Sequence, residues 1–146
     1  MEVTLEGCIQ VLHILLTSLG LFANSFLIFV ILRRTPSPFK TYAYILLHTS
    51  CTDLVTLIAD FIVMQRIIPS SPVLAYISNG SCGLISPRFC YLSYCFLLHT
   101  LIHSIYLLCI SFFYRYWILI RPSPSRLLLT VTIALFYILA LIQLVG

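Results

Sequence analysis

The strongest candidate for a functional residue in the sequence is an arginine set among aromatic residues. Arg115 stands between Tyr114 and Tyr116, and Phe112 and Phe113 precede them near the end of a long apolar stretch. At the bilayer centre an arginine would cost about 2.5–3.5 kcal/mol of insertion free energy. Near an interface, aromatic rings form a belt and the guanidinium reaches water. Arg115 is therefore either an interfacial anchor or a functional cation held at a defined depth, and the clustered aromatics favour the second.

Carboxylates form a second candidate site. Thr49, Asp53, Thr56 and Asp60 follow helical spacing and share one face. A carboxylate at membrane depth is unfavourable and usually faces the bundle interior or a water-filled cavity. Asp53 is interpreted as an ion or proton site that controls a conformational equilibrium. The alternative is a polar contact between helices, with Asn24 as its partner.

Histidines and cysteines give weaker signals. Cys95, His99, His103 and Tyr106 form another helical stripe. His99 and His103 have the spacing of two metal ligands, but the glutamate of an HExxH motif is missing, so histidines bonded across helices are favoured and no metal is expected. None of the six cysteines forms a CxxC pair, which argues against a thiol redox site, a zinc ribbon and a membrane oxidoreductase. We expect no enzyme activity and no cofactor.

Composition shows what must position these residues. Of the 146 residues, 61% are hydrophobic and 8% charged, and the mean hydropathy is +1.09. Such a chain has too few polar residues to cover a water-soluble globule, so the lipid bilayer is its main partner. The net charge of +4 is spread over short loops and gives no indication of nucleic-acid binding.

Four apolar stretches are long enough to cross a membrane. They cover approximately residues 8–32, 42–68, 89–120 and 127–146, and the seven prolines lie between them. Lipid excludes an open sheet, and the stretches lack the alternation of barrel strands. The sequence therefore predicts an all-α transmembrane bundle.

Charge predicts the orientation of this bundle. The first and third turns are rich in basic residues, whereas the second carries only Arg66 and Arg88 and the N-terminus carries none. The positive-inside rule places the N-terminus and the second turn outside. Asn79 begins an N-glycosylation sequon in the second turn, which agrees with this orientation. The second turn is expected to be irregular, and Cys82 and Cys90 are the pair available there for an extracellular disulfide.

These positions resemble those of a rhodopsin-type seven-helix G-protein-coupled receptor. Such receptors carry an asparagine in helix one, an aspartate in helix two, a triplet around an arginine at the end of helix three and a cysteine at its outer end. Asn24, Asp53, Tyr114-Arg115-Tyr116 and Cys90 match them, and Cys90 lies 25 residues before Arg115, as in the family.

More specifically, the sequence resembles the nematode serpentine receptor class delta (Srd) family of candidate chemoreceptors over essentially its whole length. The stretches that carry the resemblance are Leu32-Arg33-Arg34-Thr35-Pro36-Ser37, Gln65-Arg66-Ile67-Ile68-Pro69-Ser70, Leu74-Ala75-Tyr76-Ile77-Ser78-Asn79-Gly80, Cys90-Tyr91, Phe113-Tyr114-Arg115-Tyr116 and Pro122-Ser123-Pro124-Ser125-Arg126.

The sequence also departs from the receptor pattern. Tyr114 stands where rhodopsin-type receptors have an acidic residue, which argues against an ionic restraint on Arg115 within the helix. Leu97 stands where amine receptors carry an aspartate, which argues against an amine ligand. The chain stops at Gly146 after four spans, so we expect a fragment or truncated product, with residues 1–146 forming one partial receptor domain. Cys90 is then either free or paired with Cys82.

The resemblance implies a chemosensory receptor in the plasma membrane of sensory neurons. Its partners would be a small chemical ligand and a heterotrimeric G protein, which docks at Tyr114, Arg115 and Tyr116, while Asn24 and Asp53 form a polar core. The ligand-pocket candidates in the outer half of the third helix are Tyr94, Leu97, Leu98 and Leu101. The alternative is a complete four-helix membrane protein, such as a small transporter subunit or scaffold.

Overall fold

Each of the apolar stretches forms a helix. The computed structural model describes residues 2–36, 39–70, 73–78 and 80–145, and within them the long helices are α1 (Glu2–Arg34), α2 (Lys40–Val63), α3 (Pro87–Ile120) and α4 (Arg126–Val145). The first three are long and apolar enough to cross a membrane, and the fourth is apolar but shorter within its fully described part, Arg126–Ile142. The predicted all-α transmembrane fold is confirmed.

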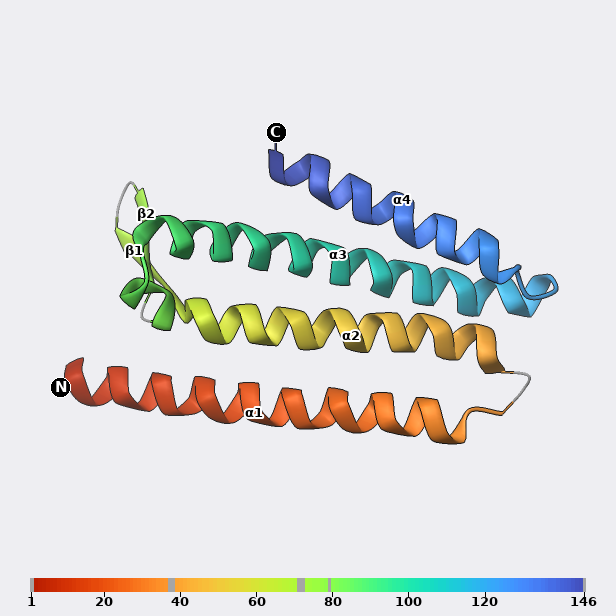
Figure 1. The fold of residues 1–146 in the computed structure, drawn as a ribbon, viewed down its shortest axis with the longest axis horizontal. Coiled ribbons are helices and arrows are strands. Elements are labelled where there is room, and N and C mark those ends of the chain that lie inside the picture. The colour runs from red at the N-terminus through yellow and green to blue at the C-terminus, as the bar shows by residue number, and fades with distance from the viewer. Residues whose placement is uncertain (1, 37–38, 71–72, 79, 146) are drawn as a thin grey trace.

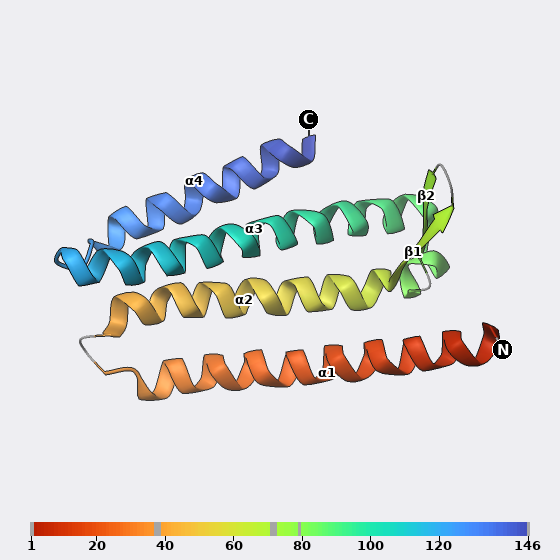
Figure 2. The same cartoon turned by 180° about the vertical axis from the view of Figure 1, so that it is seen from behind.

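The helices lie side by side in chain order, so that α2 packs between α1 and α3, and α4 packs against α3 (Figure 1). The view from behind shows α4 diverging from α3 toward the C-terminus (Figure 2). The α1–α2 and α3–α4 turns share one end of the bundle, which we call the basic end. Its basic residues are Arg33, Arg34, Lys40, Arg115, Arg121 and Arg126.

The opposite end, which we call the hairpin end, corrects the sequence prediction in two ways. The second span was expected to reach residue 68, but α2 stops at Val63 because Met64 adopts a left-handed conformation (φ 41°) and its N–H donates to the carbonyl of Asp60. The turn was expected to be irregular, but β1 (Gln65–Ser70) and β2 (Val73–Ser78) pair as an antiparallel hairpin. After this helix end, the β-branched residues Ile67 and Ile68 before Pro69 favour a strand.

The start of α3 is fixed by a cap. After the short 3₁₀ helix η2 (Ser81–Leu84), the hydroxyl of Ser86 accepts a hydrogen bond from the N–H of Phe89 at 3.1 Å. Pro87 occupies the first helical turn, where its missing N–H breaks no helix bond. The helix therefore begins at Pro87, two residues before the start expected from hydropathy.

A hydrophobic core lies toward the basic end. Ile45 of α2, Leu107 and Ile110 of α3, and Leu129 and Ile133 of α4 are buried together there. Along α1, by contrast, large apolar side chains such as those of Leu19 and Phe22 are exposed. Exposed apolar surface on this scale fits a helix that faces lipid.

Candidate functional site

Arg115 makes the main polar contact at the basic end. Its Nε donates a hydrogen bond to the phenol oxygen of Tyr42 on α2 at 2.8 Å, and its Nη2 also donates to that oxygen. The guanidinium carbon lies 5.2 Å from the ring centroid of Tyr42 and 5.9 Å from that of Phe112, within range of a cation–π interaction. These contacts hold the charge of α3 against the first turns of α2.

The side chains of the triplet Tyr114-Arg115-Tyr116 have different environments. Tyr114 is buried, with 6% of its surface exposed, and its ring stacks on that of Tyr42 with centroids 5.8 Å apart. Tyr116 is 61% exposed. The triplet therefore combines a packing residue, a tethered cation and an exposed aromatic residue, rather than three side chains on one surface.

The turn after α3 is held by Trp117. Its indole N–H donates to the carbonyl of Pro122 at 3.2 Å, and the guanidinium of Arg121 lies 5.1 Å from its ring centroid. Ser125 then accepts a hydrogen bond from the N–H of Leu128 and caps the start of α4. This turn keeps α4 beside the end of α3 that carries Arg115.

The polar core is built from different partners than the sequence suggested. Asp53 of α2 accepts a hydrogen bond from the hydroxyl of Ser104 on α3, at 3.0 Å. The side-chain amide of Asn24 instead donates to the carbonyl of Gly20 within α1, at 3.0 Å. The contact of Asp53 thus joins α2 to α3.

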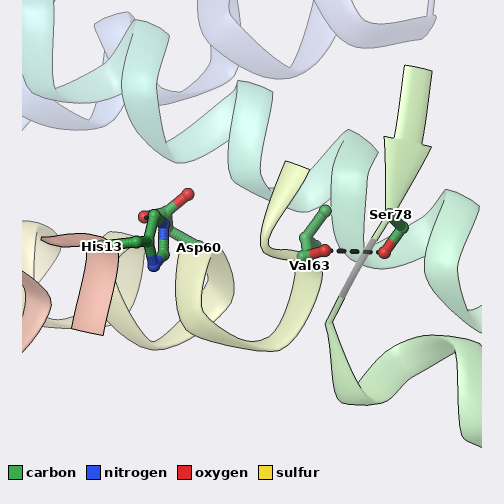
Figure 3. A network of polar contacts seen from close by, with 4 residues as sticks. All are labelled: His13, Asp60, Val63 and Ser78. Atoms are coloured by element: carbon green, nitrogen blue, oxygen red, sulfur yellow. Dashed lines mark hydrogen bonds and ion pairs between the residues drawn. The ribbon is translucent and has the colours of Figure 1, made fainter. Parts of the chain in front are cut away.

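Asp60, two turns further along α2, faces the other neighbour. Its Oδ2 lies 2.9 Å from Nε2 of His13 on α1, and both side chains are partly exposed. Figure 3 shows His13 reaching from α1 to Asp60, with the Val63 carbonyl and Ser78 close to the end of the same helix. The two aspartates therefore attach α2 to helices on its opposite sides.

The hairpin end is tied to the helices through Ser78. Its hydroxyl donates to the carbonyl of Val63 at 2.6 Å and lies 2.9 Å from the sulfur of Cys82. Cys82 and Cys90 form a disulfide that joins η2 to the first turn of α3. The sequon residue Asn79 lies outside the described residues.

The ligand-pocket candidates on α3 do not share one environment. Leu97 is buried, Tyr94 and Leu98 are half-buried, and Leu101 is exposed. Leu97 therefore serves as packing within the bundle, whereas Leu101 is open to a ligand or to a neighbouring helix. Among the described residues, no group of three or more His, Cys, Asp or Glu side chains could hold a metal ion.

Apolar helices of membrane length, interhelical polar contacts and a cluster of cations at one end define a multi-pass helical membrane protein. The family described as "Serpentine type 7TM GPCR chemoreceptor Srd" matches residues 9–146, and the chain therefore belongs to this family. The resemblance found in the sequence is confirmed.

Curated relatives agree with this membership. The chain is 37% identical to "Serpentine receptor class delta-1" of Caenorhabditis elegans over 81% of its own length and 32% of that protein. It is 38% identical to "Serpentine receptor class delta-2" over 84% of its length and 34% of the relative, and 38% identical to "Serpentine receptor class delta-18" over 86% and 38%, both from the same organism. The chain thus spans about a third of the length of these relatives. No solved structure matches it.

The sequence did not reveal the hydrogen-bond partners of Arg115 and Asp53, which are Tyr42 and Ser104. Tyr42 and Ser104 stand within apolar stretches and carry no motif of their own. The only available signal for Tyr42 was its place at the start of the second span, at the same end of the bundle as Arg115. Ser104 had no such signal, because its pairing with Asp53 depends on the rotation of both helices.

Proposed function

We propose that this chain provides the first four helices of a seven-helix chemosensory receptor that couples to a heterotrimeric G protein. Membership of the Srd family supports the proposal. The basic end would face the cytoplasm, and the N-terminus and the hairpin end would lie outside the plasma membrane of a sensory neuron, as the positive-inside rule predicts.

The observation that carries the proposal is the contact between Arg115 and Tyr42. Arg115 lies at the end of α3 where the resemblance puts the G-protein surface, and it is tied to α2 by hydrogen bonds to a neutral phenol. A phenol holds a guanidinium less tightly than a carboxylate does. The contact can therefore stabilise one helix packing and still release the cation when α3 moves against α2.

Signalling would then be a shift in population between two helix packings. In the first packing, Tyr42 retains Arg115. In the second, Arg115 and the exposed Tyr116 contact the G protein, while the hydrogen bond between Asp53 and Ser104 keeps α2 and α3 together at mid-helix. A ligand would act from the outer half of α3, where Tyr94, Leu98 and Leu101 remain partly exposed next to the buried Leu97.

The test compares two arginine variants of the receptor expressed as its gene encodes it. Arg115→Ala is expected to keep normal surface expression and to lose ligand-independent recruitment of G protein. Arg33→Ala serves as the matched control, because Arg33 is also at the basic end but lies over the ring of Phe29 within α1. If Arg115→Ala instead removed the protein from the cell surface, Arg115 would be an interfacial anchor and the proposed coupling role would be wrong.

A further inference from the structure

A small cavity lies among α2, α3 and α4, away from the basic end and the disulfide. It has a volume of about 240 Å³, and its lining includes His48 of α2, His99 and His103 of α3, and Tyr137 of α4. His99 and His103 are each only 3% exposed. Two buried imidazoles on one cavity wall call for an explanation, since polar groups inside a membrane bundle are normally paired.

The ring nitrogens of these histidines have no hydrogen-bond partner among the described residues. This holds for Nδ1 and Nε2 of both His99 and His103, and for Nδ1 of His48. The nearby hydroxyls of Thr52 and Thr100 donate to carbonyls of their own helices, His48 and Leu97 respectively. A neutral imidazole offers one donor and one acceptor. The cavity wall therefore presents both kinds of group, unpaired.

Ring contacts hold the imidazoles in place without using their nitrogens. The ring of Tyr137 meets those of His99 and His103 edge to face, with centroids 4.9 Å and 5.2 Å away. The rings of His48 and His103 meet in the same way at 5.9 Å. The positions of the imidazoles are thus set before any ligand arrives, which reduces the ordering that binding would require.

The rest of the lining consists of Thr52 and Thr100, whose hydroxyls are already bonded within their own helices, together with Cys51, Val55 and Phe96. The volume is below the range of about 300–1,000 Å³ typical of pockets for drug-sized molecules. A suitable occupant is therefore small, has a hydrocarbon body for the apolar side, and carries one group that both donates and accepts a hydrogen bond for the imidazoles. A hydroxyl or a protonated carboxyl group meets this requirement.

We propose that the cavity between His48, His99, His103 and Tyr137 binds a small molecule with a protic oxygen head group on a short hydrocarbon chain. None of the four α3 residues considered above as ligand-pocket candidates lines this cavity. The site does not depend on G-protein coupling, so it stands or falls separately from the proposed function.

The test uses the protein expressed as its gene encodes it, labelled with ¹⁵N in its histidine rings and placed in lipid nanodiscs. Hexan-1-ol is titrated in, and hexane, which enters the bilayer but cannot hydrogen-bond, is the control ligand. Hexan-1-ol is expected to shift ring ¹⁵N resonances of two histidines, and hexane is expected to leave them unchanged. Equal shifts with both compounds, or no shift with either because water alone occupies the cavity, would overturn the proposal.

Substitution then places the binding site. His103→Phe keeps a ring against Tyr137 but removes both nitrogens, and we expect it to weaken hexan-1-ol binding about tenfold. His13→Phe is the matched control, since His13 pairs with Asp60 outside the cavity. Equal binding by the wild type and His103→Phe would contradict the assignment. If His103→Phe fails to fold, the comparison of hexan-1-ol with hexane on the wild type still decides the question.

Discussion

The guanidinium of Arg115 on α3 donates hydrogen bonds to the phenol oxygen of Tyr42 on α2, and the ring of Tyr42 in turn stacks on Tyr114. One tyrosine thus contacts both the charged residue and the buried residue that precedes it. The acidic neighbour that is absent beside Arg115 is replaced by a neutral acceptor from another helix. Any movement of α3 relative to α2 at this end must break or reshape this contact.

Tyr42→Phe removes the acceptor and keeps the aromatic stack. We expect it to destabilise the detergent-solubilised protein by about 1 kcal/mol, because the two hydrogen bonds that this oxygen accepts from the guanidinium are lost at a partly exposed site. Thermal unfolding followed by circular dichroism measures this. Tyr116→Phe is the control, since Tyr116 is exposed. In a signalling assay, Tyr42→Phe should also raise ligand-independent coupling. A fall in coupling would contradict the view that Tyr42 retains Arg115.

The sequence was sufficient to predict a bundle of transmembrane helices, but not the side-chain contacts between them. Hydropathy located each helix, since lipid-facing stretches must be apolar throughout. It failed at the end of α2, because Ile67 and Ile68 are as apolar as the helix before them although they lie in β1. What ended the helix was the left-handed conformation of Met64, a residue whose type does not favour it.

The candidate site shows the same limit. Arg115 and Asp53 could be selected because a charge in an apolar stretch is unfavourable unless it has a partner. Their partners, Tyr42 and Ser104, could not be selected, because polar groups of this kind are common in apolar helices. The histidine cavity could not be predicted either, because the sequence does not determine how the helices that carry His48 and Tyr137 are rotated about their axes.

Asp53 and Ser104 are expected to be energetically coupled. A double-mutant cycle with Asp53→Ala, which removes the acceptor, and Ser104→Ala should give a coupling free energy of about 0.6–1.7 kcal/mol, between the average and the largest value for hydrogen bonds between membrane helices. Unfolding in mixed detergent measures all four proteins. Repeating the cycle with Asn24→Ala in place of Ser104→Ala is the control, and it should give a value near zero because Asn24 bonds within its own helix. Equal coupling in the two cycles would contradict the observed pairing.

Gly80 is predicted to be the least replaceable glycine at the hairpin end. A Cβ atom there would overlap the carbonyl oxygen of Ile62 and lie 2.7 Å from that of Val63, so the backbone itself must move. Gly80→Ala should cost about 1–3 kcal/mol of stability, as overpacking does. Gly83→Ala is the matched control, because a Cβ at Gly83 meets nothing within 4 Å. Thermal unfolding distinguishes the two, and similar melting temperatures would show that the close approach at Gly80 is wrong.

The orientation of the hairpin end is tested by glycosylation. Asn79 follows β2 directly in the sequence, and β2 lies at the same end of the bundle as the start of α1 (Figure 1). If this end is outside, an oligosaccharide transferred to Asn79 should slow the protein on a gel, and glycosidase treatment or Asn79→Gln should remove the shift. A second measurement uses a variant in which the other exposed cysteines are replaced by serine. In this variant, a cysteine introduced at Ser123, in the turn at the basic end, should not react with an impermeant thiol reagent in intact cells. Labelling of that cysteine in intact cells would place the basic end outside and reverse the topology.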